Sequence, residues 1–264
     1  MNDSTRVDVA YFEYGAPGTR RETRTLIEES PLRIEVLNGE SFTIMRTPGQ
    51  DRDLAVGFLF SEGIIDEVGE ILALEECPDT PNVVRVQVAD SERTPVQRTL
   101  IVNSSCGLCG RAGVEELAKG LVPLDNEIEV PIHVLYAVPE AVLEKQVLFR
   151  ETGGSHAAAL FDPAGAIHVV REDLGRHSAV DKAVGHALLH GIAMPDMGIF
   201  LSGRASLEMI VRAARARIAL VAAVSAASAM AVELAAQLGI TLCGFVRGNE
   251  VVAYTHPRRI RAEA

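Results

Sequence analysis

The feature that most constrains the fold is the alternation of helices and short apolar strands from about residue 137 onward. A helix at 138–149 precedes a strand pair at 157–161 and 166–170, which the turn-forming residues 162–165 connect. Further helices are expected at 177–190, 205–217 and 228–238, with strands at 198–202, 218–224, 240–246 and 251–254. Strands separated by helices of this length predict an α/β core with helices on both faces of a sheet.

The first hundred residues follow a different pattern. Residues up to about 20 read as a weakly ordered lead-in, and a hairpin follows, with alternating apolar residues on either side of Asn38-Gly39. A helix around 54–59 and strands at 84–88 and 100–102 complete a smaller, mostly β part. The predicted organisation is a mostly β subdomain at 1–103, a loop and linking helix at 104–136, and an α/β cofactor-binding core at 137–264.

Charge and hydrophobicity exclude several classes of protein. The 25 basic and 36 acidic residues of the 264-residue chain leave a net charge of −11, which disfavours nucleic acid as a partner. Within 1–100 there are 19 acidic and 10 basic residues, so most of the net negative charge lies there. The rest of the chain, residues 101–264, can therefore accept an anionic ligand. No membrane-spanning run or signal peptide is found, and we expect a cytoplasmic protein.

The sharpest local motif is Cys106-Gly-Leu-Cys109, which lies between the strand at 100–102 and a helix that starts near residue 111. A thiol before a helix N-terminus has a lowered pKa, because backbone N–H groups and the positive end of the helix dipole favour the thiolate. Arg111 adds a cation nearby. The segment therefore predicts a reactive or metal-bound sulfur.

Three chemistries and one inert alternative fit a single CxxC pair. Structural zinc needs two such pairs, and deaminase-type zinc needs an H-x-E or C-x-E motif that the chain lacks, so no metal is expected. Thiol–disulfide exchange is possible, although the motif precedes the α/β alternation. Sulfur transfer through a persulfide needs a nucleophilic, exposed thiol in a flexible loop, which the Ser/Gly composition supplies. The remaining alternative is an unreactive pair of loop thiols.

Polar residues gather where helices and strands of the core meet. His156 precedes a strand, and Arg176 and Lys182 lie beside acids in a strongly charged strand-to-helix junction at 171–182. Arg204 opens a helix, where free N–H groups suit a phosphate although the P-loop pattern is absent. These four residues are candidate ligand contacts. Each also has an ordinary structural alternative, such as a turn hydrogen bond for His156 or a solvated basic helix face for Arg204.

A turn between the last two strands offers further ligand groups. It lies at the carboxyl end of a sheet strand, where ligands of α/β proteins tend to bind, and consists of Phe245, Val246, Arg247, Gly248, Asn249 and Glu250. The plain alternative is a Gly-Asn hairpin. The Ala-rich stretch at 213–236 predicts tight packing or a dimer face.

Five segments, in this order, resemble the formate dehydrogenase accessory sulfurtransferase family. They are Ser-Cys-Gly-Leu-Cys-Gly at 105–110, the segments 152–156 and 171–182, residues 202–206 with Glu208, and Gly-Phe-Val-Arg at 244–247. The resemblance runs from about residue 31 to about residue 257. It implies a cytidine-deaminase-like three-layer α/β/α core without zinc, and a homodimer.

The resemblance also implies a function. Members of the family accept sulfur from a cysteine desulfurase as a persulfide and transfer it to the bis-molybdopterin guanine dinucleotide form of the molybdenum cofactor, which then enters formate dehydrogenase. The persulfide position falls on Cys106, with Cys109 as the second thiol, and the cofactor-contact segment falls on residues 245–250. The sequence thus predicts a sulfurtransferase. The alternative is a non-catalytic chaperone that binds the molybdenum cofactor.

Overall fold

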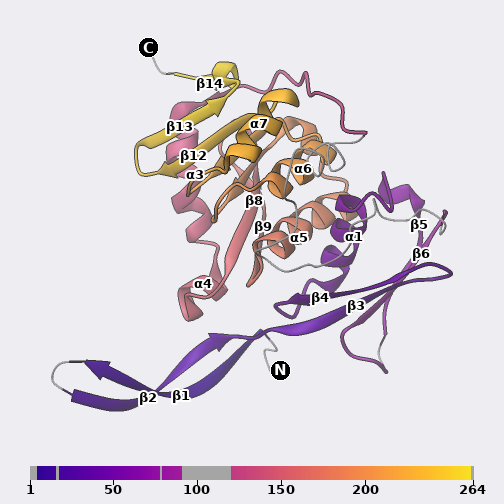
Figure 1. Ribbon diagram of the computed structural model, residues 1–264, viewed down its shortest axis with the longest axis vertical. Coiled ribbons are helices and arrows are strands. Elements are labelled where there is room, and N and C mark those ends of the chain that lie inside the picture. Colours follow the sequence, from indigo (N-terminus) through magenta and orange to yellow (C-terminus); the bar gives the residue numbers. More distant parts are fainter. Residues whose placement is uncertain (1–4, 16–17, 78, 91–119, 263–264) are drawn as a thin grey trace.

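The computed structural model describes residues 5–15, 18–77, 79–90 and 120–262. The predicted strand at 100–102, the CxxC motif, the helix near 111 and the subdomain boundary at 103 lie outside these residues. The described part is a mixed α/β structure with a six-stranded sheet, a four-stranded sheet and a separate two-stranded ribbon (Figure 1). No helix in this part of the chain is long and apolar enough to cross a membrane.

The six-stranded sheet is the centre of the core and has the order β13-β12-β11-β10-β8-β9. Strands β10, β11 and β12 run parallel, whereas β8, β9 and β13 pair antiparallel with their neighbours. All residues of β10 and β11 are buried, as expected for central strands with both faces covered. The strands are β8 (His156–Phe161), β9 (Ile167–Asp173), β10 (Gly198–Leu201), β11 (Leu220–Ala223), β12 (Thr241–Arg247) and β13 (Glu250–Thr255).

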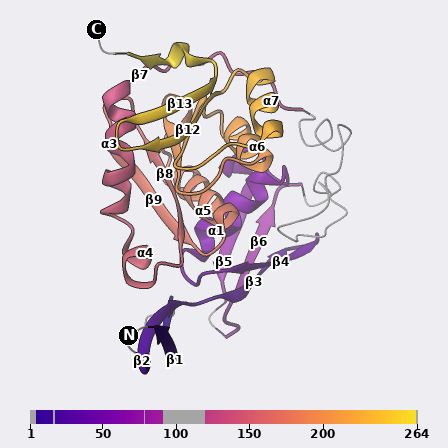
Figure 2. The same ribbon diagram turned by 60° about the vertical axis from the view of Figure 1, so that its left-hand side comes forward.

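Helices cover both faces of this sheet. Helix α3 (Ile132–Leu143) lies on one side, and α5 (Arg176–Leu189), α6 (Leu207–Arg215) and α7 (Ala229–Gln237) lie on the other (Figure 2). The alanines of the Ala-rich stretch lie mostly in the core, since Ala213, Ala222, Ala223, Ala231 and Ala235 are all at most 1% exposed. Small side chains there let helices approach the sheet closely, so tight packing accounts for the alanine content of this stretch.

The helix predicted at 138–149 is wrong in its bounds. Helix α3 starts earlier, at Ile132, and a separate short helix α4 (Val147–Thr152) follows it. Pro139 lies inside α3. Val134, Leu135, Val138 and Val142 form a buried face with helical spacing, and this packing outweighs the backbone hydrogen bond that proline removes.

The N-terminal sheet has the order β4-β3-β6-β5 and packs against helix α1 (Asp51–Ser61). Its strands are β3 (Ser30–Val36), β4 (Ser41–Arg46), β5 (Ile71–Glu76) and β6 (Val83–Val88). The predicted hairpin is confirmed: β3 and β4 pair antiparallel, and Asn38 adopts a φ of 60° in the turn. Minor elements are η1 (Val68–Glu70), β7 (Val130–Pro131), η2 (Met194–Asp196), η3 (Pro257–Arg259) and β14 (Ile260–Arg261).

Helices α1 and α5 join the two sheets by crossing at two glycines. A Cβ atom at Gly57 would lie 1.8 Å from the backbone oxygen of Asp181, and one at Gly185 would lie 1.9 Å from the backbone oxygen of Asp53. The helix backbones are therefore in direct contact, which only glycine permits at these positions. This crossing holds the N-terminal part rigidly against the helices that lead to the sheet edge.

The segment expected to be a weakly ordered lead-in instead forms a ribbon. Strands β1 (Arg6–Gly15) and β2 (Gly18–Ile27) pair antiparallel along their whole length. The ribbon extends away from the rest of the chain (Figure 1). Gly15 and Gly18 are residue types typical of loops, but Gly15 ends β1 and Gly18 begins β2.

Candidate functional site

The polar junctions singled out in the sequence meet at one edge of the six-stranded sheet. Because β10, β11 and β12 are parallel, their carboxyl ends share this edge. The antiparallel neighbours bring the start of β8 and the end of β9 to the same place, where His156 pairs with Asp173. Ligands of open α/β sheets bind at such an edge. We call this region the carboxyl-edge site.

His156 lies at the centre of the described part of this site. Its Nδ1 is 3.4 Å from Ser202 Oγ, and that hydroxyl oxygen also accepts the backbone N–H of Ala157 at 2.8 Å. Burial lowers the pKa of His156, and the nearby charges of Arg176 and Arg204 lower it further. His156 is therefore neutral at physiological pH, with two guanidinium groups in its surroundings. The sequence prediction that these three residues share a site is consistent with this arrangement.

Glycine lets the loop after β10 pass directly over the histidine ring. A Cβ at Gly203 would lie 3.2 Å from two atoms of the His156 ring. Arg204 follows in the same loop, which leads to the start of helix α6 at Leu207. The loop thus brings a cation and a helix N-terminus together above His156, an arrangement that attracts anions.

Arg176 occupies the first turn of helix α5, whose N-cap is Gly175. The Nε atom of Arg176 is buried and makes no hydrogen bond within the described residues. A buried donor without a partner is costly and is normally satisfied by a ligand or water. Arg176 therefore remains available to an anionic group at the carboxyl-edge site.

A histidine–glutamate pair borders the same region. His177 Nε2 lies 2.8 Å from Glu208 Oε2, and Ser206 Oγ donates to that carboxylate oxygen at 3.3 Å. The pair ties the first turn of α5 to the first turn of α6.

The turn at 245–250 lies at the same edge, one strand beyond β11. Strands about 4.8 Å apart place β12 roughly 10 Å from β10. Phe245 has a φ of 52°, and its N–H donates to Ser225 O at 3.2 Å. Its half-buried ring lies 5.8 Å from the Arg247 guanidinium carbon. An aromatic face and a cation are therefore presented together, with Gly248, Asn249 and Glu250 exposed beyond them.

Two predicted contact residues do not reach the site surface. Val246 is 0% exposed and is part of the core. Lys182 is also 0% exposed, and its ammonium lies 2.8 Å from Asp173 Oδ2 and donates to Thr47 O at 2.8 Å. Direct contact of Lys182 with a phosphate is thus wrong for this structure, because its donors are directed at groups of the protein interior. Its role is to fix the loop at Thr47 beneath the site.

Most of the charged junction at 171–182 forms ion pairs and hydrogen bonds within the protein and is not a binding surface. Arg171 pairs with Asp53 at 2.9 Å, and Asp181 accepts from Arg212 at 2.9 Å and from Ser61 at 2.6 Å. These bonds connect the junction to helices α1 and α6. Of the arginines in the 198–225 span, Arg212 is therefore buried and paired, not part of a solvated face.

The cysteines of the described residues have no part in this site. Cys243 is buried in β12, which raises the pKa of its thiol to about 12, and Cys77 is half-buried before the turn to β6. Cys106 and Cys109 lie outside the described residues, so their place relative to the carboxyl-edge site stays a prediction.

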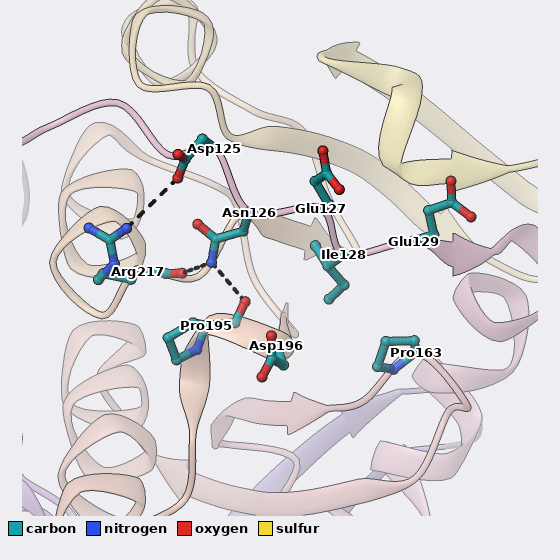
Figure 3. Close-up of a pocket in the computed structure, with 9 residues that line it drawn as sticks. All are labelled: Asp125, Asn126, Glu127, Ile128, Glu129, Pro163, Pro195, Asp196 and Arg217. Atoms are coloured by element: carbon teal, nitrogen blue, oxygen red, sulfur yellow. Dashed lines mark hydrogen bonds and ion pairs between the residues drawn. The ribbon is translucent and has the colours of Figure 1, made fainter.

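A pocket of about 490 Å³ lies at the opposite edge of the sheet, near the starts of β10 and β11 (Figure 3). Four carboxylates line it (Asp125, Glu127, Glu129 and Asp196), together with Arg217. Asn126 donates to the carbonyl oxygens of Pro195 and Arg217 across its wall. This acidic lining repels an anionic ligand, so the pocket does not replace the carboxyl-edge site.

One contributor to the site was missed in the sequence. Ser225, in the loop between β11 and α7, accepts the N–H of Phe245 and supports its unusual conformation. The same signal that identified the other loops, a polar segment directly after a buried strand, is present there. Among the described residues no group of three His, Cys, Asp or Glu side chains could hold a metal ion.

Comparison with known proteins places these features in a family. A model of the FdhD/NarQ family matches residues 27–261. A sulfur carrier protein FdhD of Streptomyces avermitilis is 41% identical over 265 residues, covering 95% of this chain and 93% of the relative. The sulfur carrier protein FdhD of Thermoplasma acidophilum is 39% identical over 241 residues, covering 88% of this chain and 85% of the relative.

A solved structure shows the same fold. The crystal structure of a protein from Desulfotalea psychrophila, described as a formate dehydrogenase accessory protein, matches with a TM-score of 0.80 and 22% sequence identity. The match covers 97% of this chain and 100% of that structure. At this identity the likeness supports the fold alone, and the family assignment rests on the sequence matches.

Proposed function

The chain belongs to the FdhD/NarQ family, and from this premise we propose that it is a sulfur carrier which delivers sulfane sulfur to a molybdenum cofactor for formate dehydrogenase. The observation that carries the proposal furthest is the gathering of Arg176, Arg204 and two helix N-termini around a neutral His156 at one sheet edge. Such a site suits the phosphates of a nucleotide-bearing substrate.

The sulfur chemistry is proposed for Cys106. Its thiolate attacks the sulfane sulfur of a cysteine desulfurase persulfide, which forms the Cys106–S–SH persulfide and releases the desulfurase thiolate. Attack of Cys109 on the inner sulfur of Cys106 would then form a Cys106–Cys109 disulfide and expel hydrosulfide to the acceptor. A thiol reductant must afterwards restore both thiols. This sequence makes the chain a sulfurtransferase, acting in the cytoplasm, where the reducing environment preserves free thiols.

The substrate is proposed to be bis-molybdopterin guanine dinucleotide. Arg176 and Arg204 would hold phosphate groups, His156 would donate or accept one hydrogen bond, and Phe245 would offer a ring on which a base can stack. Arg247, with Gly248, Asn249 and Glu250, would border the far end of the same site. The helices on both faces of the sheet support a cytidine-deaminase-like layering, and we propose a homodimer as the working form.

Titration with guanosine diphosphate tests the binding half of the proposal. Arg204→Ala and Arg247→Ala are expected to weaken binding by about tenfold or more each, since each removes one charge-assisted contact. Arg217→Ala is the matched control, because Arg217 is a half-exposed arginine at the opposite edge of the sheet. Unchanged titrations for Arg204→Ala and Arg247→Ala would remove both residues from the site.

An assay of formate dehydrogenase maturation distinguishes a sulfur carrier from a chaperone that only binds the cofactor. A carrier requires the thiol, so Cys106→Ser should abolish maturation while guanosine diphosphate binding is retained. A chaperone that binds the cofactor without carrying sulfur would support maturation normally in Cys106→Ser. A dithiol oxidoreductase would instead depend equally on Cys106 and Cys109 and show a measurable disulfide couple between them.

A further inference from the structure

Ser202 connects the end of β10 to the histidine of the carboxyl-edge site. Strand β10 ends at Leu201, and Ser202 continues its antiparallel pairing with β8 by one residue. The N–H of Ser202 donates to Ala157 O at 3.0 Å, and the Ala157 N–H donates to the side-chain Oγ of Ser202 at 2.8 Å. The serine side chain therefore completes the pairing at the point where the backbone leaves the sheet.

This pairing determines where the hydroxyl hydrogen of Ser202 points. One lone pair of Oγ accepts the Ala157 N–H, so the hydroxyl hydrogen needs an acceptor elsewhere. Among the residues that the structure describes, the other hydrogen-bond partner of Oγ is His156 Nδ1, at 3.4 Å. A neutral imidazole carries one proton, so a hydroxyl that donates to Nδ1 leaves the ring proton on Nε2.

The ring of His156 is fixed and neutral. A Cβ at Gly203 would lie 3.2 Å from the ring atoms Nδ1 and Cε1, so the loop after β10 covers this edge of the ring. Burial is the main cause that lowers the pKa of His156. The titratable and charged groups around the ring are Arg176, Arg204, Asp173 and His177. At neutral pH the ring therefore has one donor and one acceptor, and its Nδ1 edge is closed to a ligand.

The Nε2 atom is the part of the His156 ring that is left for a ligand. In the described part of the chain it has no hydrogen-bond partner, and neither Arg176 nor Arg204 donates to it. An Nε2–H group beside two guanidinium groups presents donors to whatever binds there. Such a set of donors favours an oxyanion oxygen over a ligand group that itself carries a hydrogen.

We propose that Ser202 is a positioning residue of the carboxyl-edge site: its hydroxyl donates to His156 Nδ1 and fixes the Nε2–H tautomer, which donates to a phosphate oxygen of the bound nucleotide. This inference deepens the proposed function and rests on its phosphate-bearing ligand. Without the hydroxyl, the ring exchanges between its two neutral tautomers. The Nδ1–H form directs a lone pair at the phosphate, which weakens binding.

Long-range proton–nitrogen correlation NMR of the full-length chain at neutral pH tests the tautomer directly, because protonated and unprotonated ring nitrogens have widely separated shifts. His156→Gln identifies the signal of His156 among the seven histidines. We expect the Nε2–H form in the wild-type chain and a mixture of both neutral forms in Ser202→Ala. Ser202→Thr keeps a hydroxyl and should restore the Nε2–H form.

Titration with guanosine diphosphate at the same pH measures the effect on the ligand. Ser202→Ala should bind about fivefold more weakly, which corresponds to one neutral hydrogen bond, and Ser202→Thr should bind like the wild type. Ser228→Ala is the matched control, because this hydroxyl also accepts a backbone N–H, that of Ala231 at 3.2 Å, and contacts no histidine in the described residues. It should leave the affinity and the His156 signal unchanged.

The wild-type spectrum reports the tautomer by itself, so the test does not depend on the stability of a variant. The proposal is overturned by an Nδ1–H form in the wild-type chain, by an unchanged tautomer in Ser202→Ala, or by an equal loss of affinity in Ser228→Ala. A wild-type chain that does not bind guanosine diphosphate would instead refute the proposed nucleotide ligand, and the spectra would still decide whether Ser202 sets the tautomer.

Discussion

Lys182 provides a sharp test of the account, because sequence and structure assign it different roles. In the sequence it is a candidate phosphate contact, and in the structure it is 0% exposed and paired with Asp173 at 2.8 Å. Lys182→Met keeps the approximate length of the side chain but removes the ammonium. We expect this variant to be strongly destabilised while the composition of the site surface is unchanged.

The size of the effect follows from the contacts that are lost. Asp173 is also 0% exposed, and among the described residues its buried carboxylate would keep just the hydrogen bonds from the N–H groups of Thr47 and Gly175. Removing one partner of a buried ion pair costs about 3–5 kcal/mol. For a chain of this size that corresponds to a fall in Tm on the order of 10 °C. Lys145→Met, at an exposed lysine, should change Tm little.

The loss of stability should also depend on pH. Burial raises the pKa of Asp173 above its usual range, and Lys182 is the largest influence that lowers it. Without Lys182 the pKa of Asp173 in the folded state rises further. A carboxyl whose pKa is higher in the folded than in the unfolded state loses stability as pH increases past the unfolded value, about 3.9. The deficit of Lys182→Met should therefore be larger at pH 8 than at pH 4.

Thermal unfolding followed by circular dichroism at pH 4 and pH 8 measures the stability deficit of Lys182→Met. Titration with guanosine diphosphate then shows whether the variant also loses affinity for the nucleotide. The reasoning is refuted if Lys182→Met unfolds at the wild-type temperature yet loses affinity for the nucleotide. That result would place the Lys182 ammonium at the ligand instead of beneath the site.

Three further outcomes follow from the structure. Gly57→Ala should lower the free energy of unfolding by about 3 kcal/mol or more, because its Cβ would overlap the Asp181 backbone, whereas Gly69→Ala should be nearly neutral in urea unfolding. Burial lowers the pKa of His156 below its ordinary value, so the ring gains charge, and nucleotide binding should strengthen, only as pH falls through that lowered pKa; His156→Gln should remove this dependence in calorimetric titrations. Cys243, with a pKa of about 12, should resist iodoacetamide in the folded chain, as peptide mass spectrometry would show; modification of Cys243 as fast as that of half-buried Cys77 would contradict its burial.

Local patterns predicted the elements of the core well. The alternation of apolar strands and helices after residue 156 identified β8 to β13 and helices α5 to α7. Strand order then brought His156, Arg176 and Arg204 to one edge, because parallel strands end on the same side of a sheet. Residues directly after buried strands thus gather at one edge of the sheet, and their contact with a ligand stays a prediction.

Contacts between distant segments could not be predicted in the same way. Lys182 is buried by a loop whose Thr47 lies 135 residues earlier, and nothing in the local sequence shows which side of a charged helix start will be covered. Gly57 and Gly185 read as ordinary helix glycines until the two helices are seen to cross. The β1–β2 ribbon was missed because its charged strand and glycine-rich turn are typical of loops.

The most direct test of the central claim is the intact mass of the chain after incubation with a cysteine desulfurase and cysteine. We predict a mass increase of one sulfur atom, removed by a thiol reductant, present in Cys77→Ala and absent in Cys106→Ala. An adduct that persists at full level in Cys106→Ala would contradict the assignment of the carried sulfur to Cys106.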